Sequence, residues 1–375
     1  MVSGTVWTPC ATSMSWKVCG IRAARPGNSG TENRSKETLV NDTLANVICA
    51  FVPSKRLRKR LRDVFKFGLR NYFTVMREES GLEFEHYLSV CAIAKNEGPY
   101  FKEWLEFHRL AGVDKFYIYD NESSDNTREI LEPYIQAGIV EYTFWPGQRQ
   151  QIFAYTDCLK KHKYDTRWLA FIDMDEFMVP VETRSLREVL EALPPDASQL
   201  LAGWMVYGSD GHETRPDGLV TQNYKRRMPD GLPQMVKAII KPRMFFRVSI
   251  HFNKSVIRGK TVDANGTEII LPSDRLPPPM RLPQDKIRIN HYHCKSWEEY
   301  QLRRARGDAA EGSGHKYTRK LFDELDHNEV FDPIMESYAE ALEEAVALQP
   351  GPVSEVAVST GLKSRPGSGS PNSGQ

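Results

Sequence analysis

Short apolar runs alternate with amphipathic helical patterns between Tyr87 and Phe177. The runs predict strands of a buried sheet, because a central strand is apolar on both of its faces. The stretches between them repeat apolar residues at helical spacing, and the first two end at Gly112 and Gly138. Three strand–helix units that lead into a fourth strand imply right-handed crossovers and a mostly parallel sheet. The predicted strands are 88–94, 116–119, 139–145 and 168–172, and the third helix is predicted over 148–161.

Polar residues follow these predicted strands at their carboxyl ends. Lys95 and Glu97 follow the first strand, Asp120 the second and Asp173 the fourth. The carboxyl ends of parallel strands meet at one edge of a sheet, and nucleotides bind at that edge in open α/β folds. The sequence therefore predicts an α/β protein with a nucleotide site there.

Each of these loops also has a structural interpretation. Lys95 and Glu97 can pair with each other, or they can face a phosphate and a ribose. We favour ligand contact for Asp120 and helix capping for Asp125, which lies in the same polar turn. Arg149 opposes the dipole of the third predicted helix, so either a nearby anion or exposure to solvent accounts for it.

The fourth predicted strand ends in three acidic residues, Asp173, Asp175 and Glu176. In an extended segment Asp173 and Asp175 lie on one side of the chain. Two carboxylates so close repel each other, and a hard divalent cation removes that repulsion. The alternative is a strand end with an acidic turn. Glu176 is expected either to pair with a basic side chain or to line an acceptor pocket.

The later sequence adds candidates for proton transfer. A turn with two glycines at Gly208–Glu213 presents Asp210 and His212, which suit a general base that takes a proton from a hydroxyl. The alternative is that these side chains only shape the loop. Strands are predicted over 236–240 and 245–250, and the second of them is expected to deliver His251.

A histidine pair follows in Ile287–His293. Alternation places His291 and His293 on the same side of an extended segment, as two metal ligands would be, although a structural histidine is the alternative. Ser296 is predicted to cap a basic helix over 297–306. Its arginines are expected either to steady a leaving diphosphate or to form a solvated face; they are Arg303, Arg304 and Arg306.

Composition limits the function classes. The chain has 375 residues and a net charge of +1, so nothing in its overall charge favours nucleic acid. Its six cysteines have no paired spacing, which favours reduced thiols over disulfides or a zinc site. We find neither an apolar run of membrane-spanning length nor a signal-peptide core, and we expect a cytosolic protein.

The ends of the chain differ from the middle. Residues 1–54 have little periodicity and are expected to be disordered or poorly packed, as is the Gly-Ser-Pro tail over 349–375. Residues 55–86 begin with a basic amphipathic helical pattern. This segment is expected either to contact an anionic membrane or to pack on the domain that follows. The main domain is predicted over 87–348, with its halves meeting near residue 180.

Three motifs in register carry a resemblance: Cys91–Glu97, Tyr119–Thr127 and Phe171–Phe177. Together they resemble the donor half of glycosyltransferases of the GT-A fold, most of all glycosyltransferase family 92 and related bacterial family-2-like enzymes. The resemblance covers roughly residues 87–310. It implies a Rossmann-like, mixed but mostly parallel sheet flanked by helices, with a C-terminal helical extension. It also implies a donor half, 87–180, and an acceptor half, 181–348.

The resemblance implies a hexosyltransferase that takes a sugar from a nucleotide-sugar donor, usually UDP-linked. The acceptor would be a hydroxyl of a glycan or a lipid-linked glycan, the product inverted, and the cofactor Mn²⁺ or Mg²⁺. Animal and plant members carry a membrane anchor and a luminal stem that we do not find, so we expect a bacterial, cytosolic form, peripheral on the inner membrane face at most. The implied donor-binding residues are Lys95, Asn96, Glu97, Asp120, Ser123, Arg149 and Asp173, and the implied metal ligands are Asp173, Asp175 and His291, with His293 second.

Two other functions compete with this one. An Asp-based phosphohydrolase would carry its acidic motif on the first strand, with Thr or Val two residues after the second Asp, where this chain has Phe177. A sugar-binding or scaffold protein could keep the fold without turnover, but the intact acidic motif weighs against it.

Overall fold

The protein is described here by a computed structural model. It covers residues 82–253, 257–271, 280–306, 318–348 and 350, with 52–54, 57–58 and 61; of 304–306 only the backbone is described. Contacts divide the chain into two units, Met1–Lys66 and Phe67–Gln375. In the first unit Leu57 and Arg58 are helical, and the Arg58 guanidinium donates to the carbonyl of Val52. The predictions for 1–54, for 349–375 and for most of 55–86 lie outside the described residues. The described residues from 82 onward all belong to the second unit.

The first half of this unit alternates strands and helices as predicted. In order, the elements are β1 His86–Ala94, α4 Gly98–Leu110, β2 Lys115–Asp120, α5 Thr127–Gln136, β3 Val140–Phe144, α6 Gln151–His162 and β4 Thr166–Phe171. The four strands are parallel neighbours in the order β3-β2-β1-β4. The third helix begins later than predicted, because Gly147 and Arg149 have positive φ angles of 111° and 56° and prolong the turn.

The second half adds strands of both directions. The elements are β5 Glu176–Pro180, α7 Leu186–Glu191, β6 Ala197–Val206, α8 Val220–Asn223, β7 Arg226–Arg227, β8 Val236–Ile240, η2 Pro242–Met244, β9 Lys260–Val262, β10 Ile287–His291, α9 Trp297–Arg306, α10 Arg319–Leu325, β11 Val330–Phe331, η3 Ile334–Tyr338 and α11 Ala339–Ala347. Nine of the described strands form one sheet in the order β3-β2-β1-β4-β8-β6-β10-β5, with β9 beside β6, and β7 and β11 form a separate antiparallel pair. Only β8 and β5 run against their neighbours in it. The expected mixed, mostly parallel α/β sheet is confirmed.

One predicted strand is wrong. Residues 245–250 form no continuous strand, and His251 therefore does not follow one. The preceding Pro242 lacks an amide hydrogen and begins the short helix η2, so the chain leaves the sheet after β8. Phe245 and Val248 are buried in a hydrophobic cluster instead.

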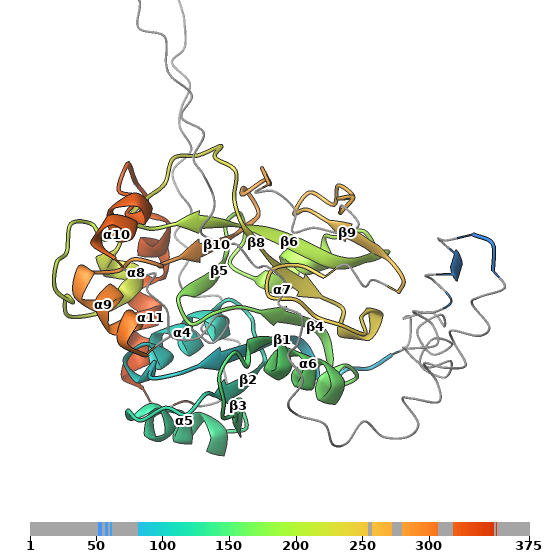
Figure 1. The fold of residues 1–375 in the computed structure, drawn as a ribbon, viewed down its shortest axis with the longest axis horizontal. Helices are drawn as coiled ribbons and strands as arrows, with labels where there is room; N and C mark the ends of the chain where they lie inside the picture. Colours follow the sequence, from blue (N-terminus) through green and yellow to red (C-terminus); the bar gives the residue numbers. More distant parts are fainter. Residues whose placement is uncertain are drawn as a thin grey trace, which may run out of the picture. The chain divides into compact units, whose positions relative to one another are not determined.

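Helices cover both faces of the sheet (Figure 1). Along β1, Leu88, Val90 and Ala92 belong to one hydrophobic cluster, which also holds the apolar faces of α4 and α5. Cys91 and Ile93 point to the opposite face, into a second cluster that includes residues of α6. The alternation along β1 therefore places a core on each side of the sheet and leaves the loops at its carboxyl edge for function. In the described part of the chain no helix is both long and apolar enough to cross a bilayer.

Candidate metal centre and adjoining pocket

Hydrogen bonds join the loops that follow β1 and β2. The Asn96 amide donates to the Ser123 hydroxyl at 2.9 Å, and the Asn96 side-chain oxygen accepts from the Ser124 amide at 2.7 Å. Asp125 accepts from the amides of Gly98 at 3.0 Å and Thr127 at 3.1 Å. The N-cap position of α5 is Asn126 rather than the predicted Asp125, but Asp125 accepts from the first amide of α5 and also fixes the start of α4. The two loops form one wall of the carboxyl edge.

The Asp120 carboxylate is occupied by two hydrogen bonds within the protein. Its carboxylate accepts from the Tyr142 hydroxyl at 2.6 Å and from the Ser123 amide at 3.1 Å. Of the other predicted donor residues, Glu97 is buried, Lys95 is half-buried, and Arg149 is exposed before the start of α6. Contact of these residues with a nucleotide stays a prediction.

Asp173 lies against a buried lysine. Its carboxylate accepts from Lys237 Nζ at 2.8 Å, from Gln151 Nε2 at 2.7 Å and from the Tyr155 hydroxyl at 3.3 Å. Burial alone would raise the pKa of Asp173, but the Lys237 ammonium outweighs it and lowers that pKa. Lys237, fully buried in β8, is also 3.2 Å from Glu176 Oε2. The open question about Glu176 is answered by this pairing; burial nevertheless raises the pKa of Glu176 to about 7.

Asp175 faces a different set of groups. The chain turns at residues 174 and 175 instead of staying extended, so Asp173 and Asp175 do not share one side. The Asp175 carboxylate accepts from Arg303 at 2.5 Å and lies 3.4 Å from His291 Nε2. Antiparallel pairing of β10 with β5 explains this approach, because it sets His291 opposite Glu176, the neighbour of Asp175.

Ligand atoms of Asp175, His291 and His293 all lie within 4.8 Å of one another. Burial, with help from Arg303 and His291, lowers the pKa of His293 well below its usual value. Burial opposes ionisation of Asp175, but Arg303 and His291 overcome it and hold its pKa well below the usual range. A carboxylate and a neutral imidazole are the forms that bind metal, so the set fits a divalent cation. Among the described residues Asp173 is not in this group, and its carboxylate is paired with Lys237. Its role as a metal ligand stays a prediction.

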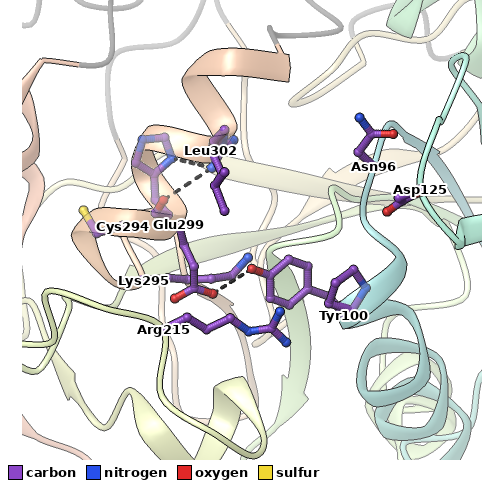
Figure 2. A pocket seen from close by; sticks show the side chains of 11 residues that line it. Asn96, Tyr100, Asp125, Arg215, Cys294, Lys295, Glu299 and Leu302 are labelled. Atoms are coloured by element: carbon purple, nitrogen blue, oxygen red, sulfur yellow. Dashed lines mark hydrogen bonds between the residues drawn. The ribbon is translucent and has the colours of Figure 1, made fainter.

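A pocket of about 400 Å³ adjoins this centre (Figure 2). Asn96 and Asp125 lie on one side of it and Leu302 on the other, with Tyr100 and Lys295 between them. Lys295 Nζ lies 3.7 Å from the centre of the Tyr100 ring. The lining residues are Asn96, Pro99, Tyr100, Asp125, Arg215, His293, Cys294, Lys295, Glu299, Leu302 and Arg303. Because His293 and Arg303 belong to both, the pocket connects the loop after β1 with the metal centre.

A capping box fixes the start of α9. The Ser296 hydroxyl accepts from the Glu299 amide at 3.2 Å, and the Glu299 carboxylate accepts from the Ser296 amide at 3.1 Å. The predicted cap at Ser296 is confirmed. Glu299 also accepts from the hydroxyls of Tyr100 and Tyr224, at 2.7 Å and 2.5 Å. The side chains of Arg304 and Arg306 lie outside the described residues.

The two predicted general bases, Asp210 and His212, lie in a turn whose contacts are separate from those of the metal centre. Asp210 has a positive φ of 49°, and its carboxylate accepts from the Lys225 amide at 2.7 Å. The His212 ring meets the Tyr224 ring edge-on, with centroids 5.7 Å apart. Neither residue is among those that line the pocket. Their role as a base stays a prediction.

Lys237 is one of the site residues that the sequence patterns did not indicate. It is the one charged residue in Val236–Ile240. A lysine inside a predicted buried strand requires an acidic partner, and that requirement was the available signal. Trp204 was also missed; its ring lies 4.2 Å from that of His291.

Comparison with known proteins gives the family. A family model described as glycosyltransferase family 92 matches residues 86–305. A family 92 protein from Oryza sativa subsp. japonica is 26% identical over 58% of this chain and 35% of its own length. The beta-1,4-galactosyltransferase galt-1 of Caenorhabditis elegans is 26% identical over 60% of this chain and 53% of its own length.

The solved structures are more distant. TarS of S. aureus in complex with UDP has 14% identity and a TM-score of 0.30, over 42% of this chain and 47% of that one. This chain spans only about a third of the length of the plant relatives it matches. These curated relatives come from plants and a nematode and give no support to the expected bacterial origin. Because a family model matches more than half of its residues, the chain belongs to glycosyltransferase family 92.

Proposed function

We propose that this chain is a metal-dependent hexosyltransferase, which moves a sugar from a nucleotide-sugar donor to an acceptor hydroxyl. The observation that carries the proposal is the convergence of Asp175, His291 and His293 beside the carboxyl edge of the parallel strands, in a member of this family. The donor is proposed to be UDP-linked, and the acceptor a glycan or lipid-linked glycan.

The residues divide the work by position. Asp175, His291 and His293 would hold the cation, which when bound offsets the negative charge of the leaving nucleoside diphosphate. The joined loops after β1 and β2 provide Asn96 and Ser123 to position the nucleotide. Asp210 or His212 is the proposed base that takes the proton from the acceptor hydroxyl.

The donor set favours Mn²⁺ over Mg²⁺. Mg²⁺ prefers an octahedron of oxygen ligands, whereas imidazole nitrogens suit transition metals better. Two of the three ligands here are imidazoles, those of His291 and His293. We therefore expect Mn²⁺ to bind more tightly than Mg²⁺.

UDP-galactose is the proposed donor. Relatives from a nematode and from Arabidopsis thaliana bear the name beta-1,4-galactosyltransferase, and those from Arabidopsis are named for galactan. A β-linked product from an α-linked nucleotide sugar requires inversion, which a single displacement assisted by one base provides. A galactose-containing glycan is accordingly the proposed acceptor.

Thermal stability in the presence of donors tests the proposal. UDP-galactose, UDP-glucose, GDP-mannose and a CMP-sugar are each added with and without Mn²⁺. We expect a Mn²⁺-dependent rise in melting temperature with UDP-sugars, greatest for UDP-galactose, because only a ligand of the folded state stabilises it. No rise with any donor would contradict the proposal. A rise without sugar transfer to any glycan would instead favour a binding protein on the same fold.

An Asp175→Asn variant sharpens this test. Loss of the carboxylate removes the charged ligand of the proposed cation, so the Mn²⁺-dependent rise should disappear, while loss of the buried pair with Arg303 should lower the melting temperature to the same extent with and without Mn²⁺. Asp196→Asn is the control, because Asp196 is about half exposed and forms a surface ion pair with Lys260 at the other end of the sheet. Retention of the full Mn²⁺-dependent rise in Asp175→Asn would exclude Asp175 as a ligand.

A further inference from the structure

Arg303 lies where the proposed metal ligands converge. Its terminal nitrogen is 2.5 Å from Asp175 Oδ2 and 3.3 Å from His293 Nδ1. His291 Nε2 lies 3.4 Å from the same Asp175 oxygen. The guanidinium therefore contacts the carboxylate of Asp175 and the imidazole of His293, two of the three proposed ligands.

A metal ion and this guanidinium exclude each other. Oxygen and nitrogen ligands lie about 2.0–2.2 Å from a first-row divalent ion, so the ion would have to occupy the volume of the Arg303 nitrogen. Their positive charges also repel strongly at a site where Asp175 is only 5% exposed. A cation bound to Asp175 Oδ2 therefore requires Arg303 to move away.

The adjoining pocket offers the room for that movement. Arg303 lines the pocket of about 400 Å³, and its neighbour Leu302 is 62% exposed. The pocket already holds two other cationic side chains, Lys295 and Arg215. Its acidic groups are engaged: Asp125 with two backbone amides, and Glu299 with two tyrosine hydroxyls and Ser296.

The charges that line the pocket determine how favourable it is for Arg303 to move there. A guanidinium that moved into the empty pocket would meet Lys295 and Arg215, whose like charges oppose it. An anion in the pocket would reverse this effect, since all three cations would then face a negative charge. The new position of Arg303 is therefore more favourable when an anionic ligand is present than when the pocket is empty.

We propose that Arg303 is a tethered cation that occupies the Asp175, His291 and His293 site until a divalent cation and a phosphate-bearing ligand displace it together. This inference rests on the proposed function for the identity of the phosphate-bearing ligand, a nucleoside diphosphate. Metal alone binds weakly, because it must separate Arg303 from Asp175 and move the guanidinium beside Lys295 and Arg215. Metal and nucleoside diphosphate bind cooperatively, because the ligand receives the expelled guanidinium.

Mn²⁺ binding, read from the electron paramagnetic resonance signal of the free ion, tests the proposal without any need for turnover. Wild type, Arg303→Gln and Arg303→Lys are titrated with Mn²⁺, each with and without UDP. Without UDP, Arg303→Gln should bind Mn²⁺ roughly tenfold or more tightly than wild type, the scale expected when one close charged competitor is removed. UDP should then improve Mn²⁺ affinity much more in wild type than in Arg303→Gln.

Two further variants serve as controls for this experiment. Arg303→Lys keeps the charge and should stay nearer to wild type than Arg303→Gln does, and it also serves if the glutamine variant fails to fold. Arg187→Gln removes an exposed arginine on α7 and should leave Mn²⁺ affinity within about twofold of wild type.

The outcomes separate this proposal from the proposed function. Mn²⁺ affinity that is equal or weaker in Arg303→Gln would show that the arginine does not compete, and would overturn the proposal. Failure of every variant to bind Mn²⁺ at millimolar concentration would overturn it too. Tighter Mn²⁺ binding in Arg303→Gln without any effect of UDP would support the competition, overturn the coupling to a nucleoside diphosphate, and count against the proposed donor.

Discussion

The two acids of the Asp-x-Asp motif do different work at the residue scale. The buried Lys237 ammonium balances the negative charge of Asp173, whereas Asp175 faces the histidines and Arg303. The sequence placed both acids at the right edge of the sheet but could not separate their roles. That separation depends on Lys237, which comes 64 residues after Asp173 and arrives with a different strand.

Replacement of the buried lysine should destabilise the fold. In Lys237→Met the carboxylates of Asp173 and Glu176 would lose their shared partner and remain near each other. Removing one partner of a buried ion pair costs about 3–5 kcal/mol, and we expect a loss of that size in the free energy of unfolding. Urea denaturation at pH 7 provides the measurement.

A matched surface pair gives the control for this prediction. Lys260 is about half exposed and pairs with Asp196, so Lys260→Met should change stability little. Adding Glu176→Gln to Lys237→Met should recover part of the loss, because it removes one of the two unpaired charges. Equal stability of Lys237→Met and wild type would refute the structural role of the lysine.

The sequence predicted the parallel strands around the site better than the antiparallel ones. The strand–helix alternation gave β1 to β4 and their parallel order, because each unit is local in sequence. Strand β8 was predicted over 236–240, but its antiparallel place between β4 and β6 was not, and β5 was not predicted as a strand; the neighbours of both lie far away along the chain. Alternation in Ile287–His293 indicated a histidine pair, but only the pairing of β10 with β5 brings His291 to Asp175.

The cap of α9 should control both stability and the metal centre. Ser296→Ala removes the hydroxyl that accepts from the Glu299 amide, and loss of such a cap costs about 1 kcal/mol. Because α9 carries Arg303, a frayed first turn should also change the affinity for Mn²⁺. Urea denaturation and Mn²⁺ titration measure the two effects.

Ser185 provides the comparison within the same fold. Its hydroxyl accepts from the Glu188 amide at 3.4 Å and caps α7. Ser185→Ala should therefore lower stability by a similar or smaller amount and leave Mn²⁺ affinity unchanged. If both variants leave the Mn²⁺ affinity unchanged, the cap of α9 has no influence on the metal centre.

At the scale of the whole molecule, the core extends beyond the part matched by the family. The match ends at residue 305, but α11 packs against α4, and Leu342 is fully buried in the larger hydrophobic cluster. Tyr338 meets Phe107 of α4 with ring centroids 5.2 Å apart. The expected C-terminal helical extension is thus part of the domain.

Truncation of Leu342 tests that packing. Leu342→Ala should lower the free energy of unfolding by about 2–5 kcal/mol, the range for a leucine removed from a packed core. Leu348→Ala is the control, because Leu348 is 59% exposed and a substitution at such a position changes stability by about 0.5 kcal/mol or less. Equal effects of the two variants would mean that α11 does not belong to the cooperative unit.

The basic segment at residues 55–62 provides the last prediction, which rests on sequence alone. Six of its eight residues are Lys or Arg, and each contributes about 1 kcal/mol of attraction near an anionic bilayer. We propose a peripheral membrane contact by this segment. The full chain should therefore sediment with phosphatidylserine vesicles but not with phosphatidylcholine vesicles, and added salt should release it, because screening weakens charge attraction.

Two sets of substitutions decide whether this segment is responsible. Replacement of Lys55, Arg56, Arg58 and Lys59 by Gln should abolish sedimentation with the anionic vesicles. The control replaces the same number of exposed cations on other elements, Lys160, Lys161, Arg187 and Lys320, and should retain it. Equal loss in both sets would mean that binding follows net charge alone, and no binding by the wild type would exclude the membrane contact. Since the control set removes the same charge, a loss confined to the first set can only come from the segment itself.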